Sequence, residues 1–577
     1  MKVILSGNEA FARGAYEAGV KVISSYPGTP SSEITDNAKK YKEIYCEWAS
    51  NEKVALEVAI GASQAGVRSM TCMKHVGLNV AADPLMTLSY TGVNGGIVVL
   101  VADDPNMFSS QNEQDSRHYA RFAKVPMLEP ADSNEAKDFI KIAMEISEKF
   151  CTPVIVRSCT RLSHSAGVVE LGERVDVGSK GLEVDIPKWV MVPANGRVRH
   201  QFVEKRLIEL TKFNSQSDLC KEELYSNSIG IICSGIVYQY VKEALPDTSI
   251  LKLGMVWPLP FDRIIEFSKK VKKLYVVEEL DNIIETELRA NGIKVQKLKR
   301  SPLGELSVDE VRKLFKKMLP EYSTLENLPG RPPSMCAGCS HRGIFYVLNR
   351  LKLYVSGDIG CYTLGLLPPL SAIHSTVCMG ASVSMAHGID KASDGELSKK
   401  SVAVIGDSTF LHTGINGLLN AFYNNGKSTI IILDNTITGM TGHQPNPATG
   451  FNIRLEPAPK VDIVELCKGI GIKRVRRIDP FDVEECLKVI KEEVETEELS
   501  VLVTNRPCIF ADRTVIDSPY YIDPDKCTGC KACTRIGCPA ISWLKNEKRA
   551  FIDESICTGC GLCIKVCRFN AINQRGK

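Results

Sequence analysis

The sequence predicts a multidomain α/β protein with parallel sheets, followed by a small cysteine-rich domain at its carboxyl end. The 577 residues are too many for one hydrophobic core, so several domains are expected. Over most of the chain, short apolar runs alternate with stretches of helical character, a pattern typical of parallel α/β sheets. Eight of the 21 cysteines lie within the last 51 residues, which marks that end as a separate region.

Residues 1–190 form the first predicted α/β domain. We expect its strands at the runs KVILSG, KVISSYPG, SMTCMKHVG, GGIVVLVADD and PVIVRS. Most of these runs are short and apolar and end in turn-forming or polar residues, which favours buried strands. Residues 191–224 are polar and charged, and we interpret them as a linker.

Two further α/β segments follow. The second predicted domain, 225–300, contains IGIICSG, SILKLGMVWPLP and KLYVVEEL, and the proline-rich segment LENLPGRPP (325–333) separates it from the third. The third domain, 331–520, contains SVAVIG and STIIILD. The remaining residues, 521–577, hold an internal repeat in which CTGCKAC and CTGCGLC lie 30 residues apart.

The repeat predicts two [4Fe-4S] clusters. Its runs have the spacings C-x2-C-x2-C-x4-C-P and C-x2-C-x2-C-x3-C, so three thiolates of each run can hold one cluster while the fourth reaches the other. We therefore assign one cluster to Cys527, Cys530, Cys533 and Cys567, and the other to Cys557, Cys560, Cys563 and Cys538.

These runs resemble bacterial two-cluster ferredoxins, with two departures. The first run has one extra residue before Cys538, and Arg568 stands where the second run would have proline. The alternative is structural zinc, but zinc sites usually pair C-x2-C units over longer gaps.

A site for a hard cation is predicted in the third domain. Gly406 and Asp407 follow the strand SVAVI, and Asn435 follows the strand STIIIL, 28 residues after Asp407. That separation fits one strand–helix–strand unit, which brings both residues to the carboxyl edge of a parallel sheet, where ligands bind. The Asp407 carboxylate, the Asn435 side chain and the Ile437 carbonyl supply the oxygen ligands that Mg²⁺ prefers. The alternative is an ordinary glycine–aspartate turn.

The same residues resemble the thiamine-diphosphate motif, G-D-G followed by N after one strand–helix–strand unit, with Ser408 in place of the second glycine. The resemblance implies bound thiamine diphosphate, whose ring acts as an electron sink for 2-oxo acids. It also implies a carboxylate from another α/β domain that hydrogen-bonds the pyrimidine ring of the cofactor. Glu52 is our candidate and Glu57 its competitor, while an ordinary acid in a first helical turn is the alternative.

A wider resemblance covers nearly the whole chain. It is carried, in order, by GNEAFARGAYEAG, YPGTPSSE, NEKVALE, SSQNEQDSR, CAGCSHRG, GDIGC, GDSTF, LDN and TGHQP. Together they resemble the 2-oxoacid:ferredoxin oxidoreductases, and most closely the branch that acts on aryl pyruvates. The resemblance implies that a 2-oxo acid, coenzyme A and oxidised ferredoxin give acyl-CoA, CO2 and reduced ferredoxin. The implied substrates are indolepyruvate, phenylpyruvate and hydroxyphenylpyruvate, and the products are aryl-acetyl-CoA thioesters.

The resemblance further implies the nature of each domain and the partners. Residues 1–190 become a pyrimidine-binding domain, 225–300 a transketolase C-terminal-like domain, 331–520 a domain for thiamine diphosphate and Mg²⁺, and 521–577 a ferredoxin-like domain with two [4Fe-4S] clusters. Expected partners are a small beta subunit in an α2β2 assembly, ferredoxin and coenzyme A.

Three residues are implied at the reaction centre. Glu52 matches the glutamate that activates the pyrimidine ring, and Thr29 and Arg117 match positions that meet the substrate carboxylate. A guanidinium can grip a carboxylate bidentately, but the residues alone allow a salt bridge at Arg117 equally well. His75 and His443 lie near predicted site segments and receive no catalytic role.

A third cluster is left open by the sequence. Related enzymes hold a cluster near thiamine with cysteines in contexts like CAGC, GDIGC and RPCIF, which here contain Cys336, Cys339, Cys361 and Cys508. Buried free thiols are the alternative, since cysteine is often a small core residue.

Composition excludes some classes of function. The net charge of +3 gives no electrostatic case for nucleic acid or an anionic membrane. No apolar run approaches the roughly 20 residues that span a bilayer, and the start lacks a signal-peptide pattern, so we expect a cytoplasmic enzyme. The alternatives are a non-oxidative thiamine-dependent decarboxylase, an electron-transfer subunit without thiamine, and an oxidoreductase for a different 2-oxo acid.

Overall fold

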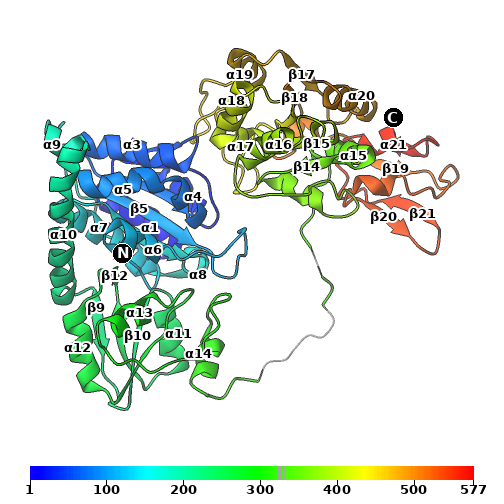
Figure 1. Ribbon diagram of the computed structural model, residues 1–577. Coiled ribbons are helices and arrows are strands. Elements are labelled where there is room, and N and C mark those ends of the chain that lie inside the picture. Colours follow the sequence, from blue (N-terminus) through cyan, green and yellow to red (C-terminus); the bar gives the residue numbers. More distant parts are fainter. Residues whose placement is uncertain (322–327, 331, 577) are drawn as a thin grey trace. The chain divides into compact units, whose positions relative to one another are not determined.

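The structure, a computed structural model, describes residues 1–321, 328–330 and 332–576. The chain forms two compact units, Met1–Thr324 and Leu325–Lys577 (Figure 1). Part of the predicted proline-rich break at 325–333 lies outside the described residues. Within the described ranges, no helix has both the length and the apolar character needed to cross a bilayer.

A seven-stranded sheet forms the centre of the first unit. Its strands lie in the order β12 (Met255–Trp257), β6 (Met127–Leu128), β7 (Val154–Cys159), β5 (Ile97–Asp103), β4 (Ser69–Lys74), β2 (Val22–Ser25) and β3 (Tyr45–Trp48). All neighbours are parallel except β12, which runs antiparallel to β6. β4, β5 and β7 are buried along their whole length, as is usual for parallel strands covered on both faces.

Eight helices accompany the strands of this first domain. They are α1 (Gly7–Glu17), α2 (Ser32–Ala38), α3 (Glu52–Gln64), α4 (His75–Val80), α5 (Ala82–Thr91), α6 (Arg117–Ala123), α7 (Ser133–Phe150) and α8 (Thr160–His164). The run KVILSG does form a strand, β1 (Lys2–Ser6), but it pairs antiparallel with β8 (Ala166–Glu170) in a separate ribbon. Because β1 has no buried residue, it does not belong to the buried parallel sheet.

The interpretation of residues 191–224 as a linker is wrong. They form α10 (Pro193–Gln216) and β9 (Cys220–Glu223). Arg206 of α10 is buried, and its guanidinium donates hydrogen bonds to the main-chain oxygens of Ser89 (3.0 Å) and Cys151 (3.2 Å). A polar sequence can pack here because its charged side chain satisfies buried carbonyl groups of the first domain.

The second sheet of this unit has four strands. Their order is β13 (Lys273–Val276), β10 (Ile229–Ser234), β11 (Ser249–Leu253) and β9, and only β9 is antiparallel to its neighbour. The remaining helices of the unit are α9 (Ile186–Trp189), α11 (Val237–Ala244), α12 (Phe261–Lys270), α13 (Ile283–Ala290) and α14 (Val308–Leu314). Because β12 from this segment completes the first sheet, the two α/β segments are tied together.

The second unit is built on a five-stranded, fully parallel sheet. Its order is β14 (Tyr354–Ser356), β15 (Ser401–Gly406), β16 (Thr429–Leu433), β18 (Ser500–Thr504) and β17 (Arg474–Ile478). The α-helices of this domain are α15 (Arg342–Leu351), α16 (Ala381–Ala392), α17 (Asp407–Thr409), α18 (Ile415–Tyr423), α19 (Ile463–Ile470) and α20 (Val483–Val494). A π-helical turn, Phe410–Gly414, lies between α17 and α18, and such turns are frequent at functional sites.

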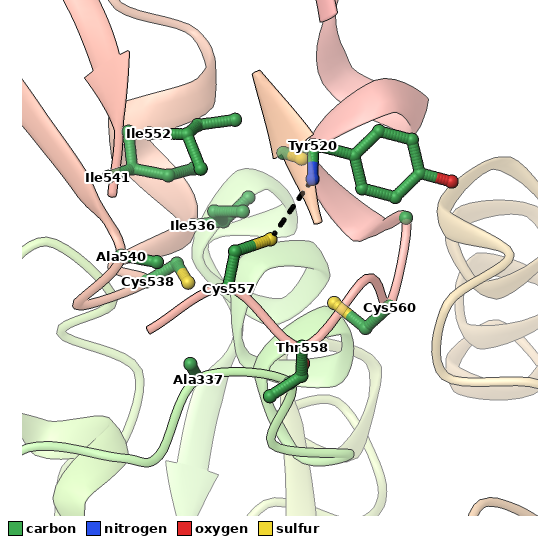
Figure 2. Close-up of a pocket in the computed structure, with 13 residues that line it drawn as sticks. Ala337, Tyr520, Ile536, Cys538, Ala540, Ile541, Ile552, Cys557, Thr558 and Cys560 are labelled. Atoms are coloured by element: carbon green, nitrogen blue, oxygen red, sulfur yellow. Dashed lines mark hydrogen bonds between the residues drawn. The ribbon is translucent and has the colours of Figure 1, made fainter. Parts of the chain in front are cut away.

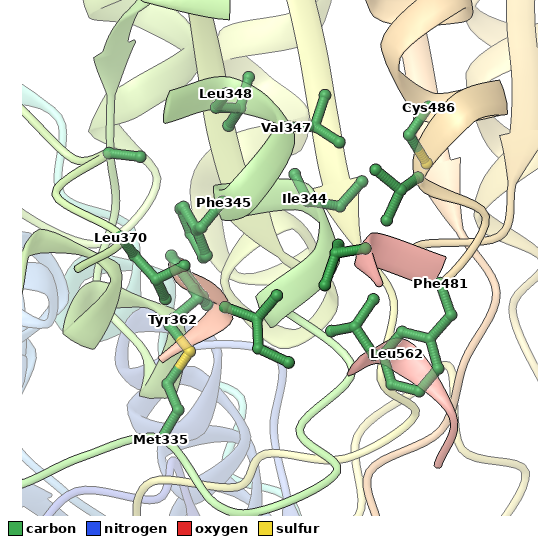
Figure 3. Packing of buried hydrophobic residues seen from close by; sticks show 14 of the residues in the cluster. Met335, Ile344, Phe345, Val347, Leu348, Tyr362, Leu370, Phe481, Cys486 and Leu562 are labelled. Carbon is green, nitrogen blue, oxygen red and sulfur yellow. The ribbon is translucent and has the colours of Figure 1, made fainter. Parts of the chain in front are cut away.

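The cysteine-rich segment forms two small antiparallel pairs and one short helix. β19 (Tyr520–Ile522) pairs with β22 (Ile572–Gln574), and β20 (Ile541–Leu544) pairs with β21 (Arg549–Ile552). The helix α21 (Leu562–Val566) follows β21 and precedes β22 in sequence. Leu562 belongs to the same buried cluster as Phe481 and Ile344 of the parallel-sheet domain (Figure 3). This shared hydrophobic core fixes the cysteine-rich domain to the rest of its unit.

Candidate functional site

Three oxygen-bearing groups converge at the carboxyl edge of the five-stranded sheet. Asp407 follows β15 and Asn435 follows β16, and these strands pair in parallel with Gly406 opposite Leu433. The inward amide atom of Asn435 lies 3.0 Å from Asp407 Oδ1 and 2.9 Å from the Ile437 main-chain oxygen. The structure therefore brings together the three groups that the sequence suggested for a cation.

The spacing of these groups suits a small octahedral ion. Mg²⁺ binds oxygen at about 2.0–2.1 Å, so adjacent ligand oxygens in an octahedron lie about 2.9 Å apart. With its nitrogen inward, the Asn435 amide donates hydrogen bonds to both oxygens. With its oxygen inward, the amide oxygen lies at distances from Asp407 Oδ1 and the Ile437 oxygen that match adjacent corners of an octahedron. These residues fit a magnesium site, and turning one amide is enough to change between the two arrangements.

Burial shapes the electrostatics of this edge. Burial, with a contribution from the nearby Asp434 carboxylate, raises the pKa of Asp407 to about 7. Asn446 Nδ2 donates to Asp407 Oδ2 at 3.1 Å. A divalent cation would offset the cost of holding two carboxylates close together out of water.

Sequence reasoning missed His341, which lies beside the cation ligands. Its Nε2 atom is 3.4 Å from Asn435 Nδ2, and burial lowers the pKa of the imidazole to about 4, so the ring is neutral. In the tautomer whose Nε2 carries no proton, the ring accepts from the Asn435 amide nitrogen, and the amide oxygen then faces Asp407. The signal available in the sequence was its place in CAGCSHRG, two residues after a candidate cluster cysteine.

Gly406 has a steric role at the same edge. A Cβ atom added there would lie 2.7 Å from the ring of Tyr362. That ring packs edge-on against the imidazole of His341, with 5.8 Å between ring centroids. A side chain at Gly406 would therefore disturb the packing that holds His341.

Glu52 occupies a comparable edge in the first unit. It begins α3 just after β3, and the Asn51 side chain caps the helix by accepting from Val54 N at 2.9 Å. Its side chain is 5% exposed and lies directly over Gly77, where an added Cβ atom would be 2.6 Å from Glu52 Oε1. The competitor Glu57 is exposed and forms a salt bridge with Lys53 at 2.5 Å, so it has the character of a surface helix acid.

Arg117 forms hydrogen bonds and salt bridges with several groups of the protein. Its guanidinium nitrogens donate to Asp115 (2.6 and 2.9 Å), Glu278 (2.7 Å) and the main-chain oxygens of Glu279 and Asp281 (2.8 Å each). It is 3% exposed and joins the two α/β segments of the first unit. A role at the substrate carboxylate would require some of these bonds to open.

Thr29 lies at the carboxyl edge that also carries Lys74. It follows β2 and is half-buried, while Lys74 ends β4 and donates to the Ser109 main-chain oxygen at 2.7 Å. Burial lowers the pKa of Lys74 to about 8. Ser109 begins the segment SSQNEQDSR, so that segment contacts this edge.

The two histidines noted in the sequence have ordinary surroundings. His75 is buried, its Nε2 atom lies 3.3 Å from the Asn112 main-chain oxygen, and burial lowers the pKa of the ring. His443 packs against Phe510, with 5.0 Å between ring centroids.

The terminal cysteines line two separate cavities. One is bordered by Cys557, Cys560, Cys563 and Cys538, and the other by Cys527, Cys530, Cys533 and Cys567. Each cavity thus takes three cysteines from one run and the fourth from the other run. Figure 2 shows the sulfur atoms of Cys538, Cys557 and Cys560 around the first cavity, where the Tyr520 N–H donates to Cys557 Sγ at 3.4 Å. Four thiols and a main-chain donor to sulfur fit a [4Fe-4S] cluster.

The other four candidate cysteines also gather in the second unit. Burial raises the pKa of the Cys361 thiol to about 11, with further contributions from the neighbouring Cys508 and Cys336 thiols. Cys339 lies close to Cys336, because its main-chain N–H donates to the Cys336 main-chain oxygen at 3.2 Å. Burial raises the pKa of the Cys339 thiol, and the Cys336 and Cys361 thiols contribute to that rise. The main-chain N–H of Cys508 donates to the main-chain oxygen of Asn435 at 3.0 Å. This cysteine group therefore adjoins the predicted cation site.

Three regions of the chain match known protein families. Family models match at residues 13–191 (pyruvate flavodoxin/ferredoxin oxidoreductase, thiamine diP-bdg), 358–504 (thiamine pyrophosphate enzyme, C-terminal TPP binding domain) and 550–573 (4Fe-4S binding domain). The chain is 40% identical to the indolepyruvate oxidoreductase subunit IorA of Pyrococcus horikoshii, over 99% of this chain and 97% of that one. It is also 40% identical to the IorA subunit of Methanothermobacter thermautotrophicus, over 100% and 98% of the two chains.

Among solved structures, a 2-oxoglutarate:ferredoxin oxidoreductase from Magnetococcus marinus matches with a TM-score of 0.46 at 18% identity. That match covers 55% of this chain and 65% of the other.

Proposed function

The chain belongs to the indolepyruvate oxidoreductase subunit IorA family, and we propose that it oxidatively decarboxylates aryl pyruvates to aryl-acetyl-CoA and CO2. The proposed substrates are indolepyruvate, phenylpyruvate and hydroxyphenylpyruvate, with ferredoxin as electron acceptor. One observation carries the proposal most directly: a main-chain hydrogen bond from Cys508 N–H to the Asn435 oxygen places a candidate cluster cysteine beside a residue of the predicted cation site. A decarboxylation centre in contact with candidate electron carriers is what an oxidative enzyme needs.

We assign the domains accordingly. Residues 1–190 form the pyrimidine-binding domain, 225–300 the transketolase C-terminal-like domain, 331–520 the domain for thiamine diphosphate and Mg²⁺, and 521–577 the ferredoxin-like domain. Matches to thiamine and 4Fe-4S family models that overlap the first, third and fourth of these ranges support the assignment.

The residues of the cation site would hold the diphosphate through Mg²⁺. Thiamine diphosphate, when bound, supplies a thiazolium ring that accepts the electron pair left when CO2 departs. Asp407, Asn435 and the Ile437 carbonyl would provide three oxygen ligands for the ion, and neutral His341 would keep the Asn435 oxygen turned inward.

Glu52 is the proposed partner of the pyrimidine ring. Its carboxyl group would hydrogen-bond a ring nitrogen and so set the protonation state of the cofactor's exocyclic amine. Support comes from its burial and from the close approach of Gly77, which leaves the carboxyl group little room to turn. Thr29 and Arg117 stay proposed contacts of the substrate carboxylate, and for Arg117 the proposal requires the Asp115 and Glu278 pairs to loosen.

The cysteine groups suggest a route for single electrons. We propose a third cluster at Cys336, Cys339, Cys361 and Cys508, adjoining the cation site. Ala337 and Gly338 of the CAGC loop line the cavity of a second cysteine group, Cys538, Cys557, Cys560 and Cys563. This contact supports that group as the second electron carrier on the route. The remaining group, Cys527, Cys530, Cys533 and Cys567, would be the last. Cys533 of the last group and Cys563 of the second group belong to one buried cluster, which supports a connection between the two groups.

The proposal includes partners that complete the enzyme. These are a small beta subunit in an α2β2 assembly and coenzyme A, in a cytoplasmic enzyme; the word "subunit" in the relatives' name supports a partner chain. Coenzyme A would capture the acyl group after both electrons have left. A non-oxidative decarboxylase would need neither coenzyme A nor the three cysteine groups.

The test uses the chain purified anaerobically with its small partner subunit. Indolepyruvate, phenylpyruvate, pyruvate and 2-oxoglutarate are assayed with coenzyme A and a viologen dye, alongside iron and thiamine analysis. Dye reduction with aryl pyruvates, abolished by Asp407→Ala, is the expected result. Reduction only with pyruvate or 2-oxoglutarate would contradict the substrate assignment. Aldehyde release without dye reduction would establish the non-oxidative alternative instead.

A further inference from the structure

A groove of about 610 Å³ opens in the second unit beside the last cysteine group. Its lining comes from the carboxyl end of α15, the start of α20, the turn after Cys533 and the end of α21. Cys530 belongs to this lining and also borders the cavity of the Cys527, Cys533 and Cys567 thiols. The groove and the proposed last cluster therefore share one cysteine.

The groove carries a concentrated positive charge. Four cationic side chains line it: Arg350, Arg535, Lys565 and Arg568. All four are exposed. Among the described lining residues Glu484 alone is acidic, and it lies 3.8 Å from Arg350.

The whole cysteine-rich segment shares this sign. Residues 521–577 contain ten lysines and arginines against five acidic residues, although the full chain has a net charge of only +3. Charges of one sign at the wall of a concave surface raise the local concentration of an oppositely charged partner and orient its approach.

Exposure singles out Cys530 as the point where an electron can leave. Of the eight terminal cysteines, Cys530 alone is exposed, whereas those of the other cavity are buried or half-buried. Phe569 lines the groove and is 47% exposed, so it offers an apolar contact beside the charges. An exposed cluster ligand, a basic rim and an exposed aromatic ring together suit a brief protein–protein encounter.

We propose that this basic groove is the docking site of the electron acceptor, a small acidic iron–sulfur protein. The inference rests on the proposed function, since it assumes that electrons reach the Cys530 cluster. In each encounter the reduced cluster loses one electron and an acceptor cluster gains one, and no bond forms or breaks. Two such transfers remove the two electrons released per 2-oxo acid.

A small anionic ligand such as the phosphates of coenzyme A is a less suitable occupant. Coenzyme A must reach the carbon that has lost CO2, and the proposed site of that carbon adjoins Asn435 and Cys508. The groove instead adjoins the last of the three cysteine groups, which serves electron exit and not thioester formation.

The test compares charge reversal inside and outside the groove in the complete enzyme. The double variant Arg535→Glu/Arg568→Glu reverses two exposed charges of the lining. The matched control, Lys545→Glu, reverses an exposed lysine of the same domain that lies outside the lining, in the turn after β20. For each enzyme, the rate with a purified acidic ferredoxin is divided by the rate with a viologen dye in the same preparation.

We expect the ratio to fall about tenfold or more in the double variant at low salt, with a raised KM for ferredoxin, because complementary charges steer encounter. The effect should shrink at about 0.5 M salt, where the Debye length is only about 4 Å. In Lys545→Glu the ratio should stay within about twofold of wild type.

An unchanged ratio in the double variant, or an equal loss in Lys545→Glu, would overturn the proposal. Loss of the small subunit on purification of the double variant would also overturn it, by showing that this subunit occupies the groove. If the double variant loses iron, Arg535→Gln/Arg568→Gln is measured instead, with the iron content as the check. Absence of dye reduction in the wild type, by contrast, would refute the proposed function itself.

Discussion

Replacing Gly77 by alanine should displace the Glu52 carboxyl group without substituting any ionisable residue. The new Cβ atom would lie 2.6 Å from Glu52 Oε1, 2.7 Å from its Cγ and 2.9 Å from its Cδ. Ordinary contact begins at 3.4 Å, so the shortfall at Oε1 is 3.4 minus 2.6, or about 0.8 Å. Turning the carboxylate alone does not relieve the contact, because Cγ is also too close.

The size of the effect follows from this displacement. A misplacement of about 1 Å at a reacting centre costs about 100-fold in rate, so we expect kcat to fall about 10- to 100-fold. That corresponds to roughly 1.4–2.7 kcal/mol of activation free energy. Overpacking should also lower the free energy of unfolding by about 1–3 kcal/mol. The assay is viologen reduction with indolepyruvate and coenzyme A, with bound thiamine measured on the same samples.

The control is Gly61→Ala on α3, the helix that Glu52 begins. Its new Cβ atom would meet nothing within 4 Å. We expect unchanged kcat and a gain of about 0.5–1 kcal/mol in stability, because alanine suits a helix interior better than glycine. If Gly77→Ala is folded and loaded with cofactor, yet its kcat stays within about twofold of wild type, then the carboxyl position of Glu52 does not control the reaction.

Four further changes test other parts of the site. Asp407→Asn should leave the cofactor-free protein as stable as wild type or more stable, because burial already raises the pKa of this carboxyl to about 7. The same variant should bind thiamine diphosphate with Mg²⁺ at least tenfold more weakly. Equal affinity of variant and wild type for the cofactor in calorimetric titration would show that Asp407 is not a ligand. Arg117→Ala should cost about 3–5 kcal/mol in unfolding free energy, because it leaves Asp115 and Glu278 buried without their cation; a raised KM at unchanged stability would instead favour substrate binding. Cys508→Ser should lower iron from about 12 to about 8 atoms per chain if the third cluster exists, and iron analysis that gives about 8 for both proteins would exclude it. Burial lowers the pKa of Lys74 to about 8 in the folded state, so between about pH 8 and the ordinary lysine pKa of 10.5 the unfolded chain binds more protons, and the free energy of unfolding should rise with pH. Denaturant unfolding at about pH 8 and about pH 10 should show a smaller rise for Lys74→Met than for wild type. An equal rise in both proteins would contradict this cause.

The sequence by itself determined the fold class and the kinds of chemistry. Buried strands such as SVAVIG and helix starts such as Asn51 depend on hydrophobicity, capping and turn formation, which act over a few residues. The spacing of the terminal cysteines and the positions of Asp407 and Asn435 at strand ends likewise depend only on residues that are close in sequence. The family resemblance follows from these segments, and the comparisons confirm it.

Contacts between distant segments required the tertiary structure. The polar run 191–224 reads as a linker until Arg206 is seen to satisfy carbonyl groups more than 50 residues away. Arg117 resembles a ligand for a substrate until Glu278 is found beside it. Likewise, the approach of Gly77 to Glu52 and of His341 to Asn435 cannot be inferred from either segment alone.

The basic groove beside Cys530 shows the same division. Its cationic residues lie on elements that are separated in sequence by up to about 220 residues, and none of those elements is unusual alone. Composition and spacing determine what a segment can form, because propensity and ligand geometry are short-range properties. Which groups lie within reach of one another is decided by packing, because segments far apart in sequence come together only when the hydrophobic core of the unit forms.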